Sequence, residues 1–172
     1  MADVTLRHDI FCTENDYWEK CVWGAPFNEG LYLKSLGFPR YEVQSDIDGT
    51  DVRTRRTLIE PPVAGLPAPL KKVMGDTLSY VENATFNKAT RVYAFKVTPS
   101  VFADKAKIHG TLSCEAATGN KFVRVAKIFV EVKVFGIGGM VEERIMADLR
   151  RSYDVGATFT NDFAAQGGFS TK

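Results

Sequence analysis

The chain has 172 residues, of which 45% are hydrophobic and 25% charged, the proportions of an ordinary globular protein. Its 22 lysines and arginines balance 21 aspartates and glutamates, and the net charge of +1 argues against nucleic acid as a partner. Cys12, Cys21 and Cys114 lack CxxC spacing, so neither a disulfide framework nor a metal site is indicated. The chain also shows no signal-peptide pattern and no run of the roughly 20 apolar residues that a membrane span requires. We therefore expect a cytoplasmic protein without a cofactor, in which residues 1–165 form a single domain and residues 166–172 a flexible tail.

The amino-terminal part of the chain predicts one strand followed by two short helices. Residues 4–10 alternate between apolar and polar side chains, and His8 falls on the apolar face. Thr13 is suited to cap a helix whose first turn is acidic. A second short helix is expected over residues 27–36 and ends at Gly37.

From Tyr41 onward the hydrophobic period changes to two, which predicts strands. Six are expected, over residues 41–48, 52–59, 76–86, 93–98, 106–116 and 122–134. If Val52 and Leu58 point inward in the second of these strands, Arg56 points inward with them. In the last strand the apolar phase changes near Ala126, which predicts a β-bulge.

A long amphipathic helix is predicted over residues 138–164. Its apolar stripe recurs at steps of three and four residues and consists of Val141, Ile145, Leu149, Ser152, Gly156, Phe159 and Phe163. The opposite face is expected to meet water and carries Glu142, Glu143, Arg144, Asp148, Arg150, Arg151 and Asp154. A helix of about 40 Å needs a broad apolar partner, so we expect the strands to form a sheet that curves around it and encloses a cavity.

Small residues lie where the helix and the sheet are expected to meet. Ser152 and Gly156 occupy the middle of the helical stripe, and Ala106, Gly110 and Ala116 lie on the inner face of one strand. Either the sheet approaches the helix closely there or space is left for a ligand, and the second interpretation is favoured slightly.

Several polar side chains fall on apolar strand faces by their phase. Arg56 and Glu82 could form a buried ion pair, because buried charges require partners. Alternatively, these two groups, His8 and the phenols of Tyr80 and Tyr93 could orient a ligand in an apolar pocket. The complete set of predicted ligand-binding residues is His8, Arg56, Tyr80, Glu82, Tyr93, Phe95, Leu112, Ile145, Leu149, Ser152 and Gly156.

The proline-rich loop over residues 61–75 interrupts the strands. Its predicted membrane-contacting residues are Val63, Leu66, Leu70, Lys71 and Lys72, because an apolar tip beside lysines can dip into a bilayer surface. The alternative is a loop that packs down on the protein.

The order of one strand, two short helices, six strands and a long helix resembles the helix-grip fold of the START-like (SRPBCC) superfamily. The stretch FVEVKVFGIGGMVEERIMADL, residues 129–149, is similar to the passage from strand to helix in an uncharacterised bacterial branch of that superfamily. The resemblance implies an α+β protein in which a curved antiparallel sheet of about seven strands wraps around the carboxyl-terminal helix.

The function that the resemblance implies is binding or transport of a hydrophobic small molecule, such as a lipid or a sterol. The chain carries no recognisable catalytic motif, and we assign no catalytic residue. An alternative is an enzyme of the polyketide cyclase, aromatase or hydratase kind, with His8, Glu82 and Tyr93 as acid–base candidates. A third possibility is a protein-interaction module that uses Phe129 on the outer face of the sheet. The oligomeric state is left open.

Overall fold

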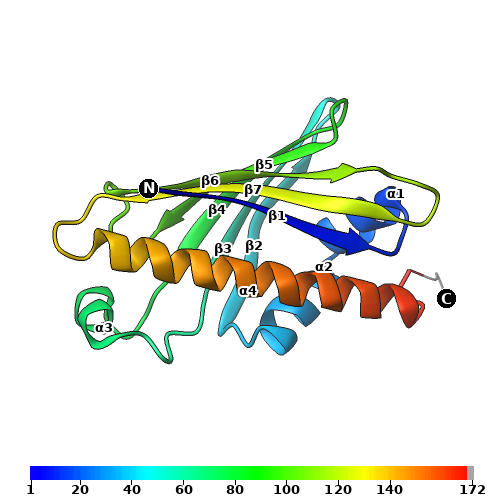
Figure 1. Ribbon diagram of the computed structural model, residues 1–172. Helices are drawn as coiled ribbons and strands as arrows, with labels where there is room; N and C mark the ends of the chain where they lie inside the picture. Colours follow the sequence, from blue (N-terminus) through cyan, green and yellow to red (C-terminus); the bar gives the residue numbers. More distant parts are fainter. Residues whose placement is uncertain (170–172) are drawn as a thin grey trace.

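A computed structural model describes residues 1–169 of the protein. Strands and a long helix form two layers, with short helices toward both ends of the long helix (Figure 1). The elements in chain order are β1 (Ala2–Ile10), α1 (Glu14–Asp16), η1 (Tyr17–Val22), α2 (Ala25–Glu29), η2 (Gly30–Ser35), β2 (Arg40–Asp48), β3 (Val52–Glu60), α3 (Ala68–Met74), β4 (Tyr80–Asn87), β5 (Val92–Pro99), β6 (Ala106–Glu115), β7 (Phe122–Val132) and α4 (Gly138–Ala165). The predicted α+β helix-grip fold is confirmed.

The seven strands form one antiparallel sheet in the order β1-β7-β6-β5-β4-β3-β2. The first strand therefore lies beside the last one, and α4 runs across the concave face (Figure 1). The predicted bulge near Ala126 is wrong, because β7 pairs without interruption with β1 and β6. The irregularity in the sheet lies instead in β2, between Val43 and Ser45.

The apparent change of phase in β7 has a different cause. Phe122, Ala126 and Ile128 lie on the inner face, and Arg124 occupies the inner position between the first two of them. Val125, on the opposite face, is also buried. Because an arginine occupies an inner position and a valine an outer one, the apolar pattern of β7 changes phase although the strand itself is regular.

The two short helices after β1 are confirmed. The hydroxyl of Thr13 accepts a 3.0 Å hydrogen bond from the backbone N–H of Asp16, as expected for an N-cap. Both helical segments end in wider turns in which an N–H bonds the carbonyl five residues earlier. The Trp23 N–H reaches the Trp18 carbonyl at 3.0 Å, and the Leu36 N–H reaches the Leu31 carbonyl at 2.8 Å.

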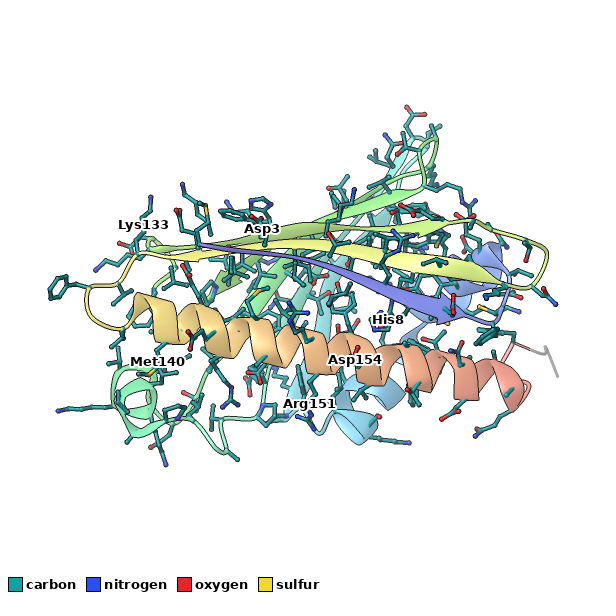
Figure 2. All side chains as sticks on the ribbon, in the orientation of Figure 1. Asp3, His8, Lys133, Met140, Arg151 and Asp154 are labelled. Carbon is teal, nitrogen blue, oxygen red and sulfur yellow. The ribbon has the colours of Figure 1, made fainter. Side chains whose placement is uncertain are left out.

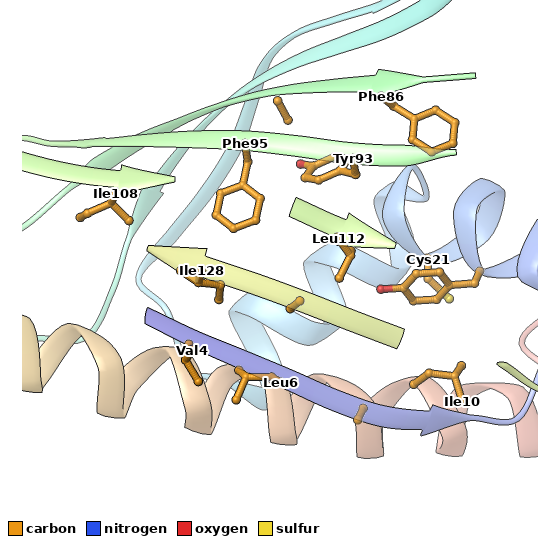
Figure 3. Packing of buried hydrophobic residues seen from close by; sticks show 14 of the residues in the cluster. Val4, Leu6, Ile10, Cys21, Phe86, Tyr93, Phe95, Ile108, Leu112 and Ile128 are labelled. Carbon is orange, nitrogen blue, oxygen red and sulfur yellow. The ribbon is translucent and has the colours of Figure 1, made fainter. Parts of the chain in front are cut away.

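One end of the space between the sheet and α4 is filled by aromatic side chains. The ring of Trp18 lies 4.7 Å from that of Phe86, and the ring of Phe27 lies 5.1 Å from that of Phe159 and 5.4 Å from that of Phe163. Figure 3 shows neighbouring apolar side chains of the same cluster projecting from the sheet toward α4. The contacts of Phe27 pack the carboxyl-terminal half of α4 against α2.

The first turn of α4 differs from the predicted pattern. Glu142 was expected to face water, but it is buried, and its carboxylate accepts a 2.7 Å hydrogen bond from the Val132 N–H, at the point where the chain leaves β7. Beyond α4, the ring of Phe169 packs on Phe163 at 5.3 Å, and Lys20 donates to the Phe169 carbonyl. Residues 170–172 of the predicted tail lie outside the described residues.

Candidate functional site

A cavity of about 290 Å³ lies between the concave face of the sheet and α4. Its volume is at the lower end of the range of roughly 300–1,000 Å³ that is typical of pockets for small molecules. The walls come from η2, the sheet, the loop before β4 and α4, and most of the side chains on them are apolar. The site is therefore suited to a small, largely apolar molecule.

One side of the cavity is formed by the face of α4 that the spacing of its apolar residues predicts. Ile145, Leu149, Ser152 and Gly156 all line it. A Cβ atom added at Gly156 would lie 3.7 Å from Nη1 of Arg124 and 3.8 Å from Leu31, which is ordinary van der Waals contact. The glycine is therefore not required by a close approach of the sheet.

The strands opposite contribute the predicted side chains of Phe95 and Leu112 (Figure 3). The small residues of β6, however, do not leave space as expected. A Cβ atom at Gly110 would lie 2.7 Å from the ring of Phe95 and 2.4 Å from the Lys127 carbonyl oxygen, so that ring takes the place of a side chain there. Ala116 lies beyond β6 and is exposed, whereas Ala106 does line the cavity.

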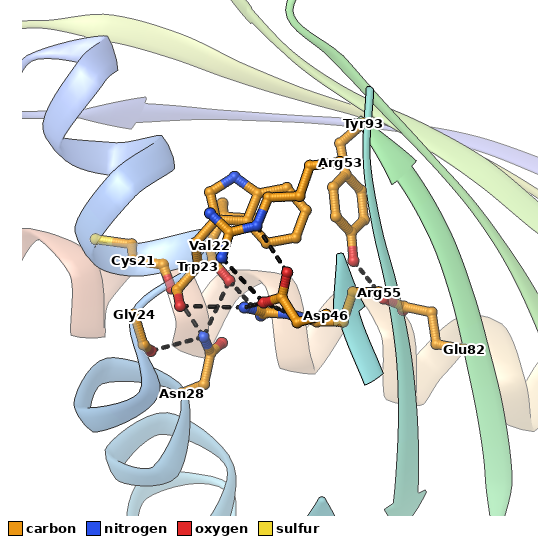
Figure 4. A network of polar contacts seen from close by, with 10 residues as sticks. All are labelled: Cys21, Val22, Trp23, Gly24, Asn28, Asp46, Arg53, Arg55, Glu82 and Tyr93. Carbon is orange, nitrogen blue, oxygen red and sulfur yellow. Dashed lines mark hydrogen bonds and ion pairs between the residues drawn. The ribbon is translucent and has the colours of Figure 1, made fainter. Parts of the chain in front are cut away.

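A carboxyl and several phenols form a polar part of the wall. The hydroxyl of Tyr93 donates a 2.5 Å hydrogen bond to Oε1 of Glu82 (Figure 4). Burial raises the pKa of Glu82, against the opposing effects of this hydrogen bond and of Arg55. Burial also raises the pKa of Tyr32 and that of Tyr80, so these phenols stay protonated at neutral pH. The carboxyl of Glu82 and the phenols of Tyr32, Tyr80 and Tyr93 all line the cavity and offer hydrogen-bonding groups.

The arginine on the inner face of β3 is Arg55, and the predicted inward position of Arg56 is wrong. Arg56 is exposed and bonds Gln44 at 2.9 Å and Asn83 at 3.4 Å on the outer face. Ile59 and Thr57 are the most buried residues of β3 and set its phase. Val52 and Leu58, on which the prediction rested, are only partly covered.

The predicted ion pair between Arg56 and Glu82 is consequently absent among residues 1–169, since Arg56 pairs in register with Asn83. Arg55 is 7% exposed and is fully occupied by protein groups. It contacts Asp46 at 2.7 Å, the Val22 carbonyl at 2.8 Å and the Trp23 carbonyl at 3.1 Å, and so ties η1 to the sheet (Figure 4).

His8 lies on the inner face of β1, as its phase predicts, but it is not among the residues that line the cavity. Its Nε2 lies 2.7 Å from the carboxylate of Asp154 on α4 (Figure 2), and its Nδ1 lies 3.2 Å from Arg124. Arg124 does line the cavity. The sequence analysis missed Arg124. Assigning every even-numbered residue of β7 to the inner face would have identified it.

The loop over residues 61–75 packs partly under α4. Arg144 donates a 3.1 Å hydrogen bond to the Gly65 carbonyl, and Leu70 is 0% exposed. The prediction that Leu70 contacts a membrane is therefore wrong, because α3 turns this side chain into the core. Lys71 and Lys72 are exposed.

Within residues 1–169, no group of three or more histidine, cysteine or acidic side chains could hold a metal ion. No helix there is long and apolar enough to cross a membrane. His109 faces outward, as predicted, and its ring stacks on that of Phe129 at 5.0 Å.

Solved structures share the fold over nearly the whole chain. The Zhui aromatase/cyclase from Streptomyces sp. R1128 is 11% identical, with a TM-score of 0.65 over 96% of this chain and 94% of that one. Norcoclaurine synthase from Thalictrum flavum, in complex with dopamine and hydroxybenzaldehyde, is 14% identical, with a TM-score of 0.64 over 99% and 89%. A START superfamily protein from Mycobacterium smegmatis is 10% identical, with a TM-score of 0.60 over 94% and 98%.

These identities are low, so the similarity establishes the START-like fold and not an activity. No curated protein matches the chain in sequence. One family model does match it, over residues 12–163. The chain therefore belongs to the family described as "Protein of unknown function (DUF2505)".

Proposed function

We propose that the protein binds a hydrophobic small molecule, such as a lipid or a sterol-like compound, in the cavity between the sheet and α4. The observation that carries the proposal is the cavity itself, about 290 Å³ in volume and lined mainly by apolar side chains. A core that served only for stability would be filled, because protein interiors pack as densely as organic crystals. The aromatic packing at one end of α4 meets that expectation, whereas the middle of the helix faces open space.

The polar groups of the wall support a ligand that is apolar along most of its length and carries at least one hydrogen-bonding group. Pockets of this kind orient their ligands through a few polar groups in an otherwise apolar surface. The carboxyl of Glu82 and the phenols of Tyr32 and Tyr80 are groups of this type.

Native mass spectrometry of the purified protein, followed by extraction with organic solvent, tests the proposal. We expect an adduct with the mass of an apolar compound, or its capture when a mixture of lipids is offered. A protein that carries no adduct, and takes up none from the mixture, would contradict the proposal.

A second candidate function is an enzyme of the cyclase, aromatase or hydratase kind. It is favoured by the Tyr93–Glu82 hydrogen bond of 2.5 Å at the cavity wall, because the pair could hold a proton beside a bound molecule. His8, the third acid–base candidate, does not line the cavity. An extracted compound that is recovered chemically changed after incubation with wild-type protein, but unchanged after incubation with Glu82→Gln, would favour this function over simple binding.

A further inference from the structure

Arg124 is a buried cation without a carboxylate of its own. The residue is 5% exposed, and among residues 1–169 no acidic oxygen lies within ion-pair distance of its guanidinium. Its Nε is buried and makes no hydrogen bond in the described structure. A buried charge in this situation is costly unless a partner compensates it.

The groups that do contact Arg124 carry no net charge. Nη2 donates to the Tyr153 carbonyl at 2.7 Å and to Nδ1 of His8 at 3.2 Å, and the guanidinium lies 5.2 Å from the centre of the Tyr153 ring. Since an arginine only donates, Nδ1 of His8 is the acceptor and Nε2 carries the proton that faces Asp154. The imidazole therefore separates the guanidinium from that carboxylate.

Arg124 faces the ligand space. The residue lines the cavity, and Nη1 lies beside Gly156, where α4 has no side chain. Arg55 provides the comparison within the same cavity wall, because its guanidinium is paired with Asp46 and two backbone carbonyls. Arg55 has an acidic partner in the protein, whereas Arg124 has none among residues 1–169.

We propose that the ligand of the cavity is an apolar carboxylic acid whose carboxylate binds the guanidinium of Arg124. This inference rests on the proposed function and specifies the ligand's chemical class. The planar fork of a guanidinium matches a carboxylate with two parallel hydrogen bonds. A singly charged group suits the site better than a phosphate monoester, because the cavity's other cation, Arg55, is already neutralised by Asp46.

Neither acid that lines the cavity opposes such a ligand. Asp148 is paired with Arg144 at 2.8 Å. Burial raises the pKa of Glu82, which favours its neutral form, and its Oε1 accepts from Tyr93. In its neutral form the carboxyl can donate a hydrogen bond to a second polar group of the ligand.

The test compares decanoate with decan-1-ol, two molecules of equal chain length that differ in charge, by isothermal titration calorimetry near neutral pH. We expect wild-type protein to bind decanoate at least about tenfold more tightly than decan-1-ol. Arg124→Gln should lose this preference while binding decan-1-ol as before. Arg7→Gln is the control, because Arg7 is an exposed arginine of β1 that pairs with Glu115 at the surface.

The possible results separate the inference from the proposed function. Equal affinities for both compounds in wild-type protein, or an unchanged preference in Arg124→Gln, would overturn the inference and leave apolar binding standing. Binding of neither compound to wild-type protein would contradict both. If Arg124→Gln does not fold, Arg124→Lys decides. It should weaken decanoate severalfold and leave decan-1-ol unchanged, and an unchanged affinity for decanoate would overturn the inference.

Discussion

The phenol of Tyr93 on β5 donates a 2.5 Å hydrogen bond to the carboxyl of Glu82 on β4, at the wall of a largely apolar cavity. Adjacent strands bring the two residues together, and no cation neutralises the carboxyl by direct contact within residues 1–169. Glu82 is therefore a half-buried acid whose charge the surrounding protein disfavours.

Replacement of Glu82 by glutamine should stabilise the protein more at higher pH. Burial raises the pKa of Glu82 in the folded state above its ordinary value of 4.5. As the pH rises through that ordinary value, the unfolded chain loses its proton while the folded protein keeps it, so stability falls until the pH passes the folded-state pKa. Glutamine removes this loss. Thermal unfolding between about pH 4 and pH 8 should show a Tm difference, variant minus wild type, that starts near zero and grows.

Glu143→Gln is the control for this experiment, because Glu143 is an exposed residue of α4. A Tm difference for Glu82→Gln that stays constant with pH, or that Glu143→Gln reproduces, would contradict the burial of an uncompensated carboxyl.

The two neighbouring arginines of β3 should respond differently to replacement by methionine. Arg55→Met removes the donor to the Trp23 carbonyl, one of two donors to the Val22 carbonyl and the ion pair with Asp46, and should lower the free energy of unfolding by about 2–4 kcal/mol. Arg56→Met removes exposed contacts on the outer face and should change it by less than about 0.5 kcal/mol. Urea unfolding measures both values. Equal losses would mean that the phase assigned to β3 is incorrect.

The exposed lysines of α3 bear on the predicted membrane contact. Lys71 and Lys72 belong, with Val63 and Leu66, to the predicted contact region. Each lysine near an anionic bilayer contributes about 1 kcal/mol, so Lys71→Glu combined with Lys72→Glu should reduce sedimentation with phosphatidylserine vesicles by about tenfold or more. The measurement is the bound fraction at increasing lipid concentration.

The matched control reverses two lysines on the outer face of the sheet, Lys96→Glu with Lys127→Glu. If both pairs of substitutions weaken sedimentation equally, the attraction is general and the loop is not a contact site. Wild-type protein that does not sediment with the vesicles would rule out the contact altogether.

The sequence predicted the fold well because its strongest signals are periodic. The helical stripe from Val141 to Phe163 gave the position of α4, and alternation gave the strands. Four predicted residues of α4 line the cavity, because a long helix presents only one apolar face to the sheet.

The errors of the sequence analysis arose where the phase depended on a few residues. In β3, two partly covered apolar residues near the strand ends suggested the wrong face for Arg56, whereas Thr57 is one of the buried positions. In β7, the inward Arg124 interrupts the apolar pattern on the inner face. The interruption looks like a change of phase, which is why a bulge is predicted there. Alternation assigns every charged side chain to the face that meets water. It therefore misplaces a charged side chain that points inward, as Arg124 does.

Gly156, the glycine of α4 that borders the cavity, should accept a side chain without strain. Gly156→Ala should fit without strain and raise stability by about 1 kcal/mol, because glycine is a poor helix former and the new methyl group makes ordinary contacts. Gly156→Leu should place its larger side chain in the cavity and keep the protein folded. Thermal unfolding of both variants checks these expectations, and a Tm lowered by several degrees in Gly156→Ala would contradict them.

The most direct test of a ligand-binding cavity is a fluorescence titration of wild-type protein and Gly156→Leu with the neutral apolar dye N-phenyl-1-naphthylamine. Gly139→Leu is the matched control, because a Cβ atom at Gly139 of the same helix would meet no other group within 4 Å. We predict a saturable rise in fluorescence for wild-type protein and Gly139→Leu, and none for folded Gly156→Leu. Equal saturable binding by Gly156→Leu, or no saturable binding by wild-type protein, would contradict the assignment of the cavity as the binding site.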